Sequence, residues 1–149
     1  MWTRIADQQD VAGSYDSKSR PTKDNTTGTN AHVYDYSYDA VDKRILSTET
    51  GDPTTWTYDL ASRMTTSTDG TGITSYTFDA NGNMTNVWPP AGNRVTMGYD
   101  KENRLTSHND GGTRTTYTYD GEGLKRTEIT GAGTTTLVWD GSNYLQERT

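Results

Sequence analysis

An aromatic residue followed by aspartate recurs along this 149-residue chain at a nearly constant spacing of about 20 residues. A repeat of this length restricts the fold to architectures that stack one small supersecondary unit many times. In the most regular copy, Tyr76 and Phe78 share one face of an extended strand, because alternate side chains point to the same side. The six aromatic–Asp steps are Tyr38-Asp39, Tyr58-Asp59, Phe78-Asp79, Tyr99-Asp100, Tyr119-Asp120 and Trp139-Asp140.

Two further columns of apolar residues keep the same phase as these steps. The first stands two residues before each step and consists of Tyr36, Trp56, Tyr76, Met97, Tyr117 and Leu137. The second follows each Asp and consists of Ile45, Met64, Met84, Leu105 and Leu145, with Leu124 arriving one residue early. We predict that the aromatic and apolar columns together form the core of the domain.

Turn residues separate the strands of each copy. Asn81-Gly82 tolerates positive φ at both central positions of a type I′ turn and therefore predicts a β-hairpin. Asp120-Gly121 and Asp140-Gly141 also stand at turn positions of their copies, and loops rich in Gly, Asp, Pro or Asn precede each new strand. Two strands per copy predict about twelve antiparallel strands, and strand twist should bend so broad a sheet. We therefore predict an all-β repeat protein of stacked antiparallel hairpins that form a curved or spiralling sheet.

Composition alone would favour disorder. Leu, Ile, Val and Phe together make up less than the roughly 20% below which a charged chain is usually disordered, and the net charge is −6. The apolar residues nevertheless keep register, and about a fifth of the chain is threonine, which favours strands. The pattern thus indicates a folded sheet.

The N-terminal part is less regular than the rest. We predict an irregular segment over residues 1–33, with Trp2 and Ile5 as anchors and a loop over residues 17–32, followed by a repeat domain over residues 34–149. Tyr15-Asp16, with Arg20 four residues after the Asp, reads as a degenerate copy of the repeat.

The copies resemble the YD repeat of the Rhs family, which reads roughly Y-x-Y-D-x-x-G/N-R-L. The best matches are Arg63-Met64 after Tyr58-Asp59, and Asn103-Arg104-Leu105 after Tyr99-Asp100. The resemblance covers residues 34–149. Departures are Asn83, Leu124 and Tyr144 where the family usually has Arg, and the displaced Lys43-Arg44-Ile45.

This resemblance implies a hollow β-shell, as in Rhs proteins, the C component of insecticidal toxin complexes, and teneurins. It also implies a bacterial, secreted or surface-exposed protein, extracellular or on the cell surface. Shell proteins of this kind usually end in a D-P-x-G-like motif where a toxin is cut off, and no such motif follows Trp139. We therefore carry over neither self-cleavage nor a toxin payload.

The polar residues that recur in the repeat favour structural roles over catalysis. Each Asp at a strand end is expected to bond the backbone of its turn, with calcium binding or catalysis as the weaker alternatives. Arg63 and Arg104 are expected to pair with the Asp four residues earlier or to stack over a neighbouring Tyr, with ligand binding as the alternative. The repeat-defining residues are Tyr38, Asp39, Tyr58, Asp59, Arg63, Phe78, Asp79, Tyr99, Asp100, Arg104, Tyr119, Asp120, Trp139 and Asp140.

Few elements of an enzyme are present in the sequence. His32 and His108 stand alone, cysteine is absent, and residues 79–83 lack the downstream Glu of a calcium loop. We expect no catalytic residues, no cofactor and no metal site. The pI near 4.8 weighs against nucleic acid, and no apolar run is long enough for a membrane span.

The favoured function is therefore a non-enzymatic structural or encapsulating segment of an Rhs-type shell. We expect it to form a homo-oligomer or filament through its open sheet edges, or to join the rest of a shell. The alternative function is a glycan- or protein-binding module that uses exposed aromatic ladders.

Overall fold

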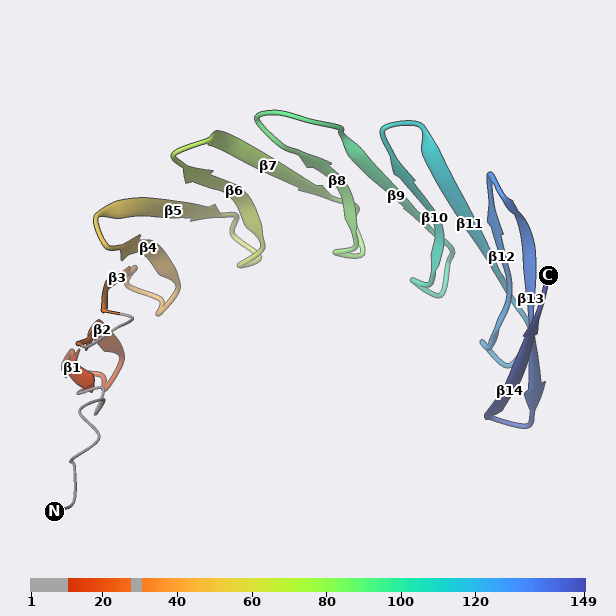
Figure 1. Ribbon diagram of the computed structural model, residues 1–149, viewed down its shortest axis with the longest axis horizontal. Helices are drawn as coiled ribbons and strands as arrows, with labels where there is room; N and C mark the ends of the chain where they lie inside the picture. The colour runs from red at the N-terminus through yellow and green to blue at the C-terminus, as the bar shows by residue number, and fades with distance from the viewer. Residues whose placement is uncertain (1–10, 28–30) are drawn as a thin grey trace, which may run out of the picture. The chain divides into compact units, whose positions relative to one another are not determined.

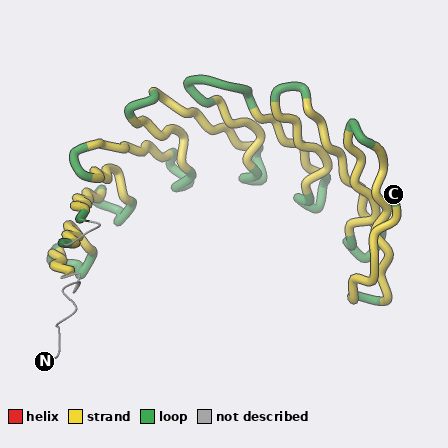
Figure 2. The backbone as a smooth tube through the Cα atoms, viewed as in Figure 1, coloured by secondary structure: helices red, strands yellow, loops and turns green. Residues whose placement is uncertain are grey.

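The computed structural model describes residues 11–27 and 31–149, and within them it has fourteen β-strands and no helix. Figure 1 and Figure 2 show how one hairpin follows another along the chain. The strands are β1 (Val11–Tyr15), β2 (Pro21–Thr26), β3 (His32–Tyr38), β4 (Arg44–Glu49), β5 (Asp52–Tyr58), β6 (Met64–Asp69), β7 (Gly72–Phe78), β8 (Met84–Trp88), β9 (Val95–Tyr99), β10 (Leu105–Asp110), β11 (Thr113–Tyr119), β12 (Lys125–Thr130), β13 (Gly133–Asp140) and β14 (Asn143–Arg148).

Strand order is the order of the chain. The chain divides into two compact units at residues 73 and 74, within β7. In each unit, antiparallel neighbours pair along a single layer of sheet, for example β3 with β4 and β11 with β12. The predicted all-β fold of stacked antiparallel hairpins is confirmed.

The turn that starts at each Asp of the aromatic–Asp steps, here called the Asp turn, differs from the type I′ turn that we expected. In the copy at Asp79, the Gly82 N–H donates to the Asp79 carbonyl (3.1 Å) and the Asp79 N–H to the Asn83 carbonyl (2.9 Å). Gly82 has a φ of 91°, whereas Asn81 is not among the residues with positive φ. This is a type I turn closed by a left-handed residue and a bulge, so the type I′ prediction is wrong here.

The same left-handed position recurs three residues after the other Asp residues of this turn. It is occupied by Ser19, Asp42, Ser62, Asn103 and Gly123. Gly123, and not Gly121, therefore takes the positive φ that the Asp120-Gly121 pair predicted. The type I′ turn belongs instead to the opposite ends of the hairpins, where Thr50-Gly51 and Gly111-Gly112 have positive φ at both central positions.

The N-terminal region has more regular structure than its sequence indicated. Residues 21–26, expected in a loop, form β2, which pairs with β1 and with β3. The turn between β1 and β2 starts at Asp16, where the Asp16 N–H donates to the Arg20 carbonyl as in the later copies. Polar residues suffice for β2 because both of its edges are hydrogen-bonded to neighbours. Trp2 and Ile5 lie outside the described residues.

The aromatic columns lie on one face of each unit, which we call the aromatic face. They are half-buried and do not form the closed core that we expected. Among the residues whose burial is described, Leu137, 7% exposed, is the only buried hydrophobic side chain. The reason is architectural: within each unit the described strands form a single layer of sheet, so the rings pack only against neighbours in the same face.

In the copies of Tyr38 and Tyr119, the register also corrects the predicted column of apolar residues that follows each Asp. The residue opposite each step aromatic is Arg44 in the copy of Tyr38 and Lys125 in the copy of Tyr119. Ile45 lies beside this position and is 37% exposed. Long basic side chains replace apolar ones here because their aliphatic stems can cover a ring while the charge stays in water.

Candidate functional site

The Asp turn is built around one carboxylate oxygen. In the copy at Asp100, Oδ1 accepts hydrogen bonds from the main-chain N–H groups of Glu102 (3.0 Å) and Arg104 (2.9 Å). These two hydrogen bonds to the turn backbone are an Asx-type arrangement that holds the conformation of the loop without help from packing. The same pair of bonds is made by Asp16, Asp39, Asp59, Asp79 and Asp120.

These hydrogen bonds favour the ionised carboxylate. The main-chain N–H of Arg63 holds the pKa of the Asp59 carboxyl below its ordinary value. In the next copy, the side-chain amide of Asn83 lowers the pKa of Asp79 in the same sense. Hydrogen bonds that are made only to the charged form lower a pKa, so the turns are held by carboxylates and not by carboxylic acids.

The second carboxylate oxygen binds the side chain four residues on. Nε of Arg63 donates to Oδ2 of Asp59 (2.7 Å), and Nε of Arg104 donates to Oδ2 of Asp100 (2.7 Å). Where the repeat has Asn83 in place of Arg, Nδ2 of the amide donates to Oδ2 of Asp79 (3.0 Å). The departure from the family pattern at residue 83 thus keeps the hydrogen bond and gives up the charge.

The basic side chain also reaches the next copy of the repeat. The guanidinium of Arg104 lies 4.7 Å from the centre of the Tyr119 ring, a cation–π contact. Arg20 lies over Tyr38 in the same way (4.5 Å), and Lys43 lies over Tyr58 (5.3 Å).

A hydrogen bond that the sequence did not indicate ties five of the six step aromatics, all except Phe78, to the preceding copy. The Tyr119 hydroxyl donates to the Leu105 carbonyl (2.7 Å). A preference for Tyr over Phe at this column was the available signal, because a buried edge of a ring needs no hydroxyl. Equivalent bonds join Tyr38 to Pro21 (2.8 Å), Tyr58 to Arg44 (2.8 Å), Tyr99 to Met84 (3.0 Å) and Trp139 to Lys125 (2.8 Å).

The last copy departs from this scheme. Asp140 lies within β13 opposite Asn143, and its turn is one residue shorter than the others. Gly141 takes a positive φ of 57° at the start of this shorter turn. Trp139 instead packs edge-to-face against Tyr144, with ring centres 5.5 Å apart. Of the residues predicted to define the repeat, Asp140 is therefore placed differently from the other Asp residues.

The surface of the sheet also contains polar hollows. One of about 320 Å³ is lined by Tyr34, Arg44, Ser47, Glu49, Asp52, Thr54 and Trp56. It forms because the short Ser47 lies opposite Tyr36 on one side and Thr54 on the other. The Arg44 guanidinium lies 4.8 Å from the Trp56 ring centre, and the Tyr34 hydroxyl donates to Glu49 (2.7 Å).

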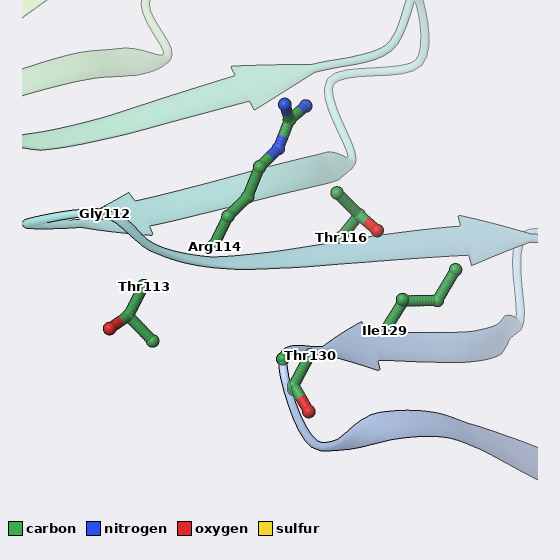
Figure 3. A pocket seen from close by; sticks show the side chains of 7 residues that line it. Gly112, Thr113, Arg114, Thr116, Ile129 and Thr130 are labelled. Carbon is green, nitrogen blue, oxygen red and sulfur yellow. The ribbon is translucent and has the colours of Figure 1, made fainter.

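A second hollow, of about 480 Å³, lies beside the turn at Gly112. Figure 3 shows Arg114, Thr116 and Ile129 pointing to one side of their strands, and Thr113 and Thr130 to the other. Both hollows are shallow surface features that could accept polar groups of a ligand.

Within residues 11–27 and 31–149, no three His, Asp or Glu side chains come together as metal ligands would. His32 accepts or donates a hydrogen bond with Thr26 (3.1 Å), whereas His108 lies in β10 opposite Met97 and Thr115. The described part also has no helix of the length and apolar character needed to cross a membrane.

In-phase hairpins, with five of the six step aromatics bonded to the preceding copy, define this chain as a β-hairpin repeat protein. A family model described as RHS Repeat matches residues 78–114 and 99–136. The resemblance inferred from the sequence is confirmed, because residues 78–136 match the RHS Repeat. A search of curated proteins found no match.

Solved structures show the same fold at low identity. The chain is similar to "Crystal Structure of TcdB2-TccC3-Cdc42" (TM-score 0.77, 13% identity, 93% of this chain and 9% of that chain). It is also similar to "Crystal Structure of TcdB2-TccC3-TEV" (TM-score 0.77, 15% identity, 93% of this chain and 9% of that chain). A third match is "Crystal Structure of TcdB2-TccC3 without hypervariable C-terminal region" (TM-score 0.72, 16% identity, 88% of this chain and 9% of that chain). The chain thus spans about 9% of the length of the structures that it matches.

Proposed function

We propose that this chain is a non-enzymatic wall segment of an Rhs-type shell, in a bacterial protein that is secreted or displayed at the cell surface and related to toxin shells. The match of residues 78–136 to the RHS Repeat supports the structural role. The fold shared with the TcdB2-TccC3 structures agrees with it. On this proposal its partners are other parts of such a shell.

The observation that carries the proposal is that the charged side chains of the repeat bind the turn backbone, each other and the neighbouring copy. Asp100 is held by two backbone N–H groups and by Arg104, and Arg104 in turn covers Tyr119. Each of these groups is occupied in joining one copy of the repeat to itself or to the next. A set of side chains arranged in this way supports a rigid sheet and not a reaction.

A second candidate function is the binding of a glycan or of a protein surface on the aromatic face. The hollow between β3, β4 and β5 supports this alternative, because it combines the Trp56 ring with the charged groups of Arg44 and Glu49. Ligand sites often combine aromatic walls with a few polar groups that fix orientation.

Binding to a glycan array and thermal unfolding, measured on the same proteins, separate the two functions. The wild-type chain and Trp56→Ala would be compared with Trp88→Ala, which removes an exposed tryptophan outside the hollow. A wall segment should give no glycan hits, and Trp56→Ala should lower the melting temperature. Reproducible hits that Trp56→Ala abolishes and Trp88→Ala retains, with melting unchanged, would establish the binding module instead.

A further inference from the structure

One register is repeated at every described junction within the two units, where a junction is the pairing of a copy's return strand with the first strand of the next copy. At the junction of β10 and β11, Ser107 lies opposite Thr116. Ser107 stands two residues after Leu105, the partner of Tyr99, and Thr116 stands three residues before Tyr119. The same offsets hold for Lys23 with Asp35, Leu46 with Thr55, Asn86 with Thr96 and Thr127 with Thr136.

The same five junctions carry the hydrogen bond from the step aromatic to the preceding copy. In each, the ring donates to the carbonyl of the residue that lies opposite the previous aromatic, as Tyr119 does to Leu105. A junction therefore has two parts: a donor aromatic on the incoming strand, and a carbonyl with a fixed register on the outgoing strand.

Each part is present without its counterpart at one end of the described sheet. Tyr15 on β1 is 68% exposed and lies opposite Pro21, as the later step aromatics lie opposite their partners. At the other end, Tyr144 on β14 lies opposite Trp139 and occupies the position of Leu105. All six residues of β14 are exposed, and β1 and β14 are the outermost strands of the described part.

We propose that β14 of one molecule pairs with β1 of a second copy of this chain, in the register of the internal junctions. Gln146 stands two residues after Tyr144, and Ala12 three residues before Tyr15, so these two residues lie opposite each other. The Tyr15 hydroxyl donates to the Tyr144 carbonyl. The occupant is a second copy because the contact continues an interface that the chain already makes five times.

This contact is heterologous, so it can be repeated from one molecule to the next. It pairs the outer edges of β1 and β14, which have no strand partner within the described residues, and exposed edge strands tend strongly to pair. The net charge of −6 opposes association, but charges farther apart than about 8 Å are screened at physiological salt. The inference rests on the proposed structural role, which a strictly monomeric segment could still fulfil.

Cysteine cross-linking tests the register directly, because the chain contains no cysteine. Directly opposite residues of antiparallel strands have Cα atoms about 4.5–5.5 Å apart, within the range that a disulfide spans. Full-length Ala12→Cys would be mixed under mild oxidation with a mass-labelled chain that carries Gln146→Cys. The matched control is Glu147→Cys, which places the thiol on the other face of β14.

The expected result is a 12–146 disulfide, identified by mass spectrometry, in several-fold excess over the 12–147 disulfide. Tyr15→Phe in the Ala12→Cys chain should reduce its yield, because the ring remains and only the hydroxyl is lost. Equal yields with the two partners would overturn the proposal. So would a light-scattering mass that stays at 16.5 kDa at micromolar concentration. Glycan hits in the array would contradict the wall role and leave this cross-link unaffected.

Discussion

The hydroxyl of Tyr119 offers the sharpest test of how the repeats are held together. Tyr119→Phe removes the hydrogen bond to the Leu105 carbonyl (2.7 Å) and keeps the ring under Arg104. Desolvation raises the pKa of Tyr119, so its hydroxyl is partly withdrawn from water. A hydrogen bond in such a position contributes about 1 kcal/mol net to the free energy of unfolding, and its loss leaves the carbonyl without this donor.

Urea denaturation would measure this loss through tryptophan fluorescence, since Trp139 lies in the same unit on β13, which pairs with β12 next to the strand of Tyr119. For a slope of about 1–2 kcal/mol per molar urea, the midpoint should fall by roughly 0.5–1 M. Far-UV circular dichroism should report the same midpoint, because one junction is weakened and the strands remain.

The matched control is Tyr117→Phe, two residues away on the same face and strand. Among the described residues, the Tyr117 hydroxyl makes no hydrogen bond, and its ring lies 5.2 Å from Nζ of Lys125. Its midpoint should therefore stay close to that of the wild type. Equal shifts in the two variants would refute the reasoning, because the hydrogen bond to the preceding copy would then contribute nothing specific.

Three further predictions concern the turn, the sheet face and pH. Gly82→Ala should cost about 1 kcal/mol in urea unfolding, because alanine resists the left-handed conformation that this position needs. Asn81→Ala loses only the exposed amide contact to Asn103 and should cost less. A larger cost for Asn81→Ala than for Gly82→Ala would support a type I′ turn instead. Leu137→Ala should cost about 2–3 kcal/mol, at the low end for a buried leucine because one face of the sheet is open. Ile129→Ala, at a residue 41% exposed, should cost under about 1 kcal/mol, and similar costs would mean that Leu137 is not shielded. Because the pKa of Asp59 is lowered in the folded state, its contribution is present above the unfolded pKa near 4 and is lost as the pH falls. The melting temperature should drop between about pH 5 and pH 3 and less so in Asp59→Asn; an identical profile in the variant would show that this carboxylate is not coupled to folding.

The period of the aromatic–Asp steps was sufficient to predict the class of fold. Alternation along Tyr76 and Phe78 indicated a strand, and the steps placed one hairpin in every copy. The expectation that each Asp bonds its turn backbone agrees with the geometry at Asp100. Local patterns of this kind are readable because strand alternation and Asx bonding involve residues that are close in the chain.

The sequence misled where a conformation depended on more than its local residues. Asn81-Gly82 fits a type I′ turn by composition, yet the hairpin pairs Asp79 with Asn83, which leaves the left-handed position to Gly82 alone. Residues 21–26 read as a loop because they are polar, yet two neighbouring strands supply hydrogen bonds to β2. Pairing across the sheet overrode composition in both places.

The sequence by itself determined the all-β class, the number of hairpins after residue 33, the resemblance to the Rhs repeat and the positions of the Asp turns, because each of these repeats with a fixed period. Only the tertiary structure decided how one copy is joined to the next. The hydrogen bond from Tyr119 reaches back to Leu105, and the half-buried state of the columns follows from a single layer of sheet. Both depend on which strand lies beside which and on what covers a face, and these are relations between distant residues that no local pattern encodes.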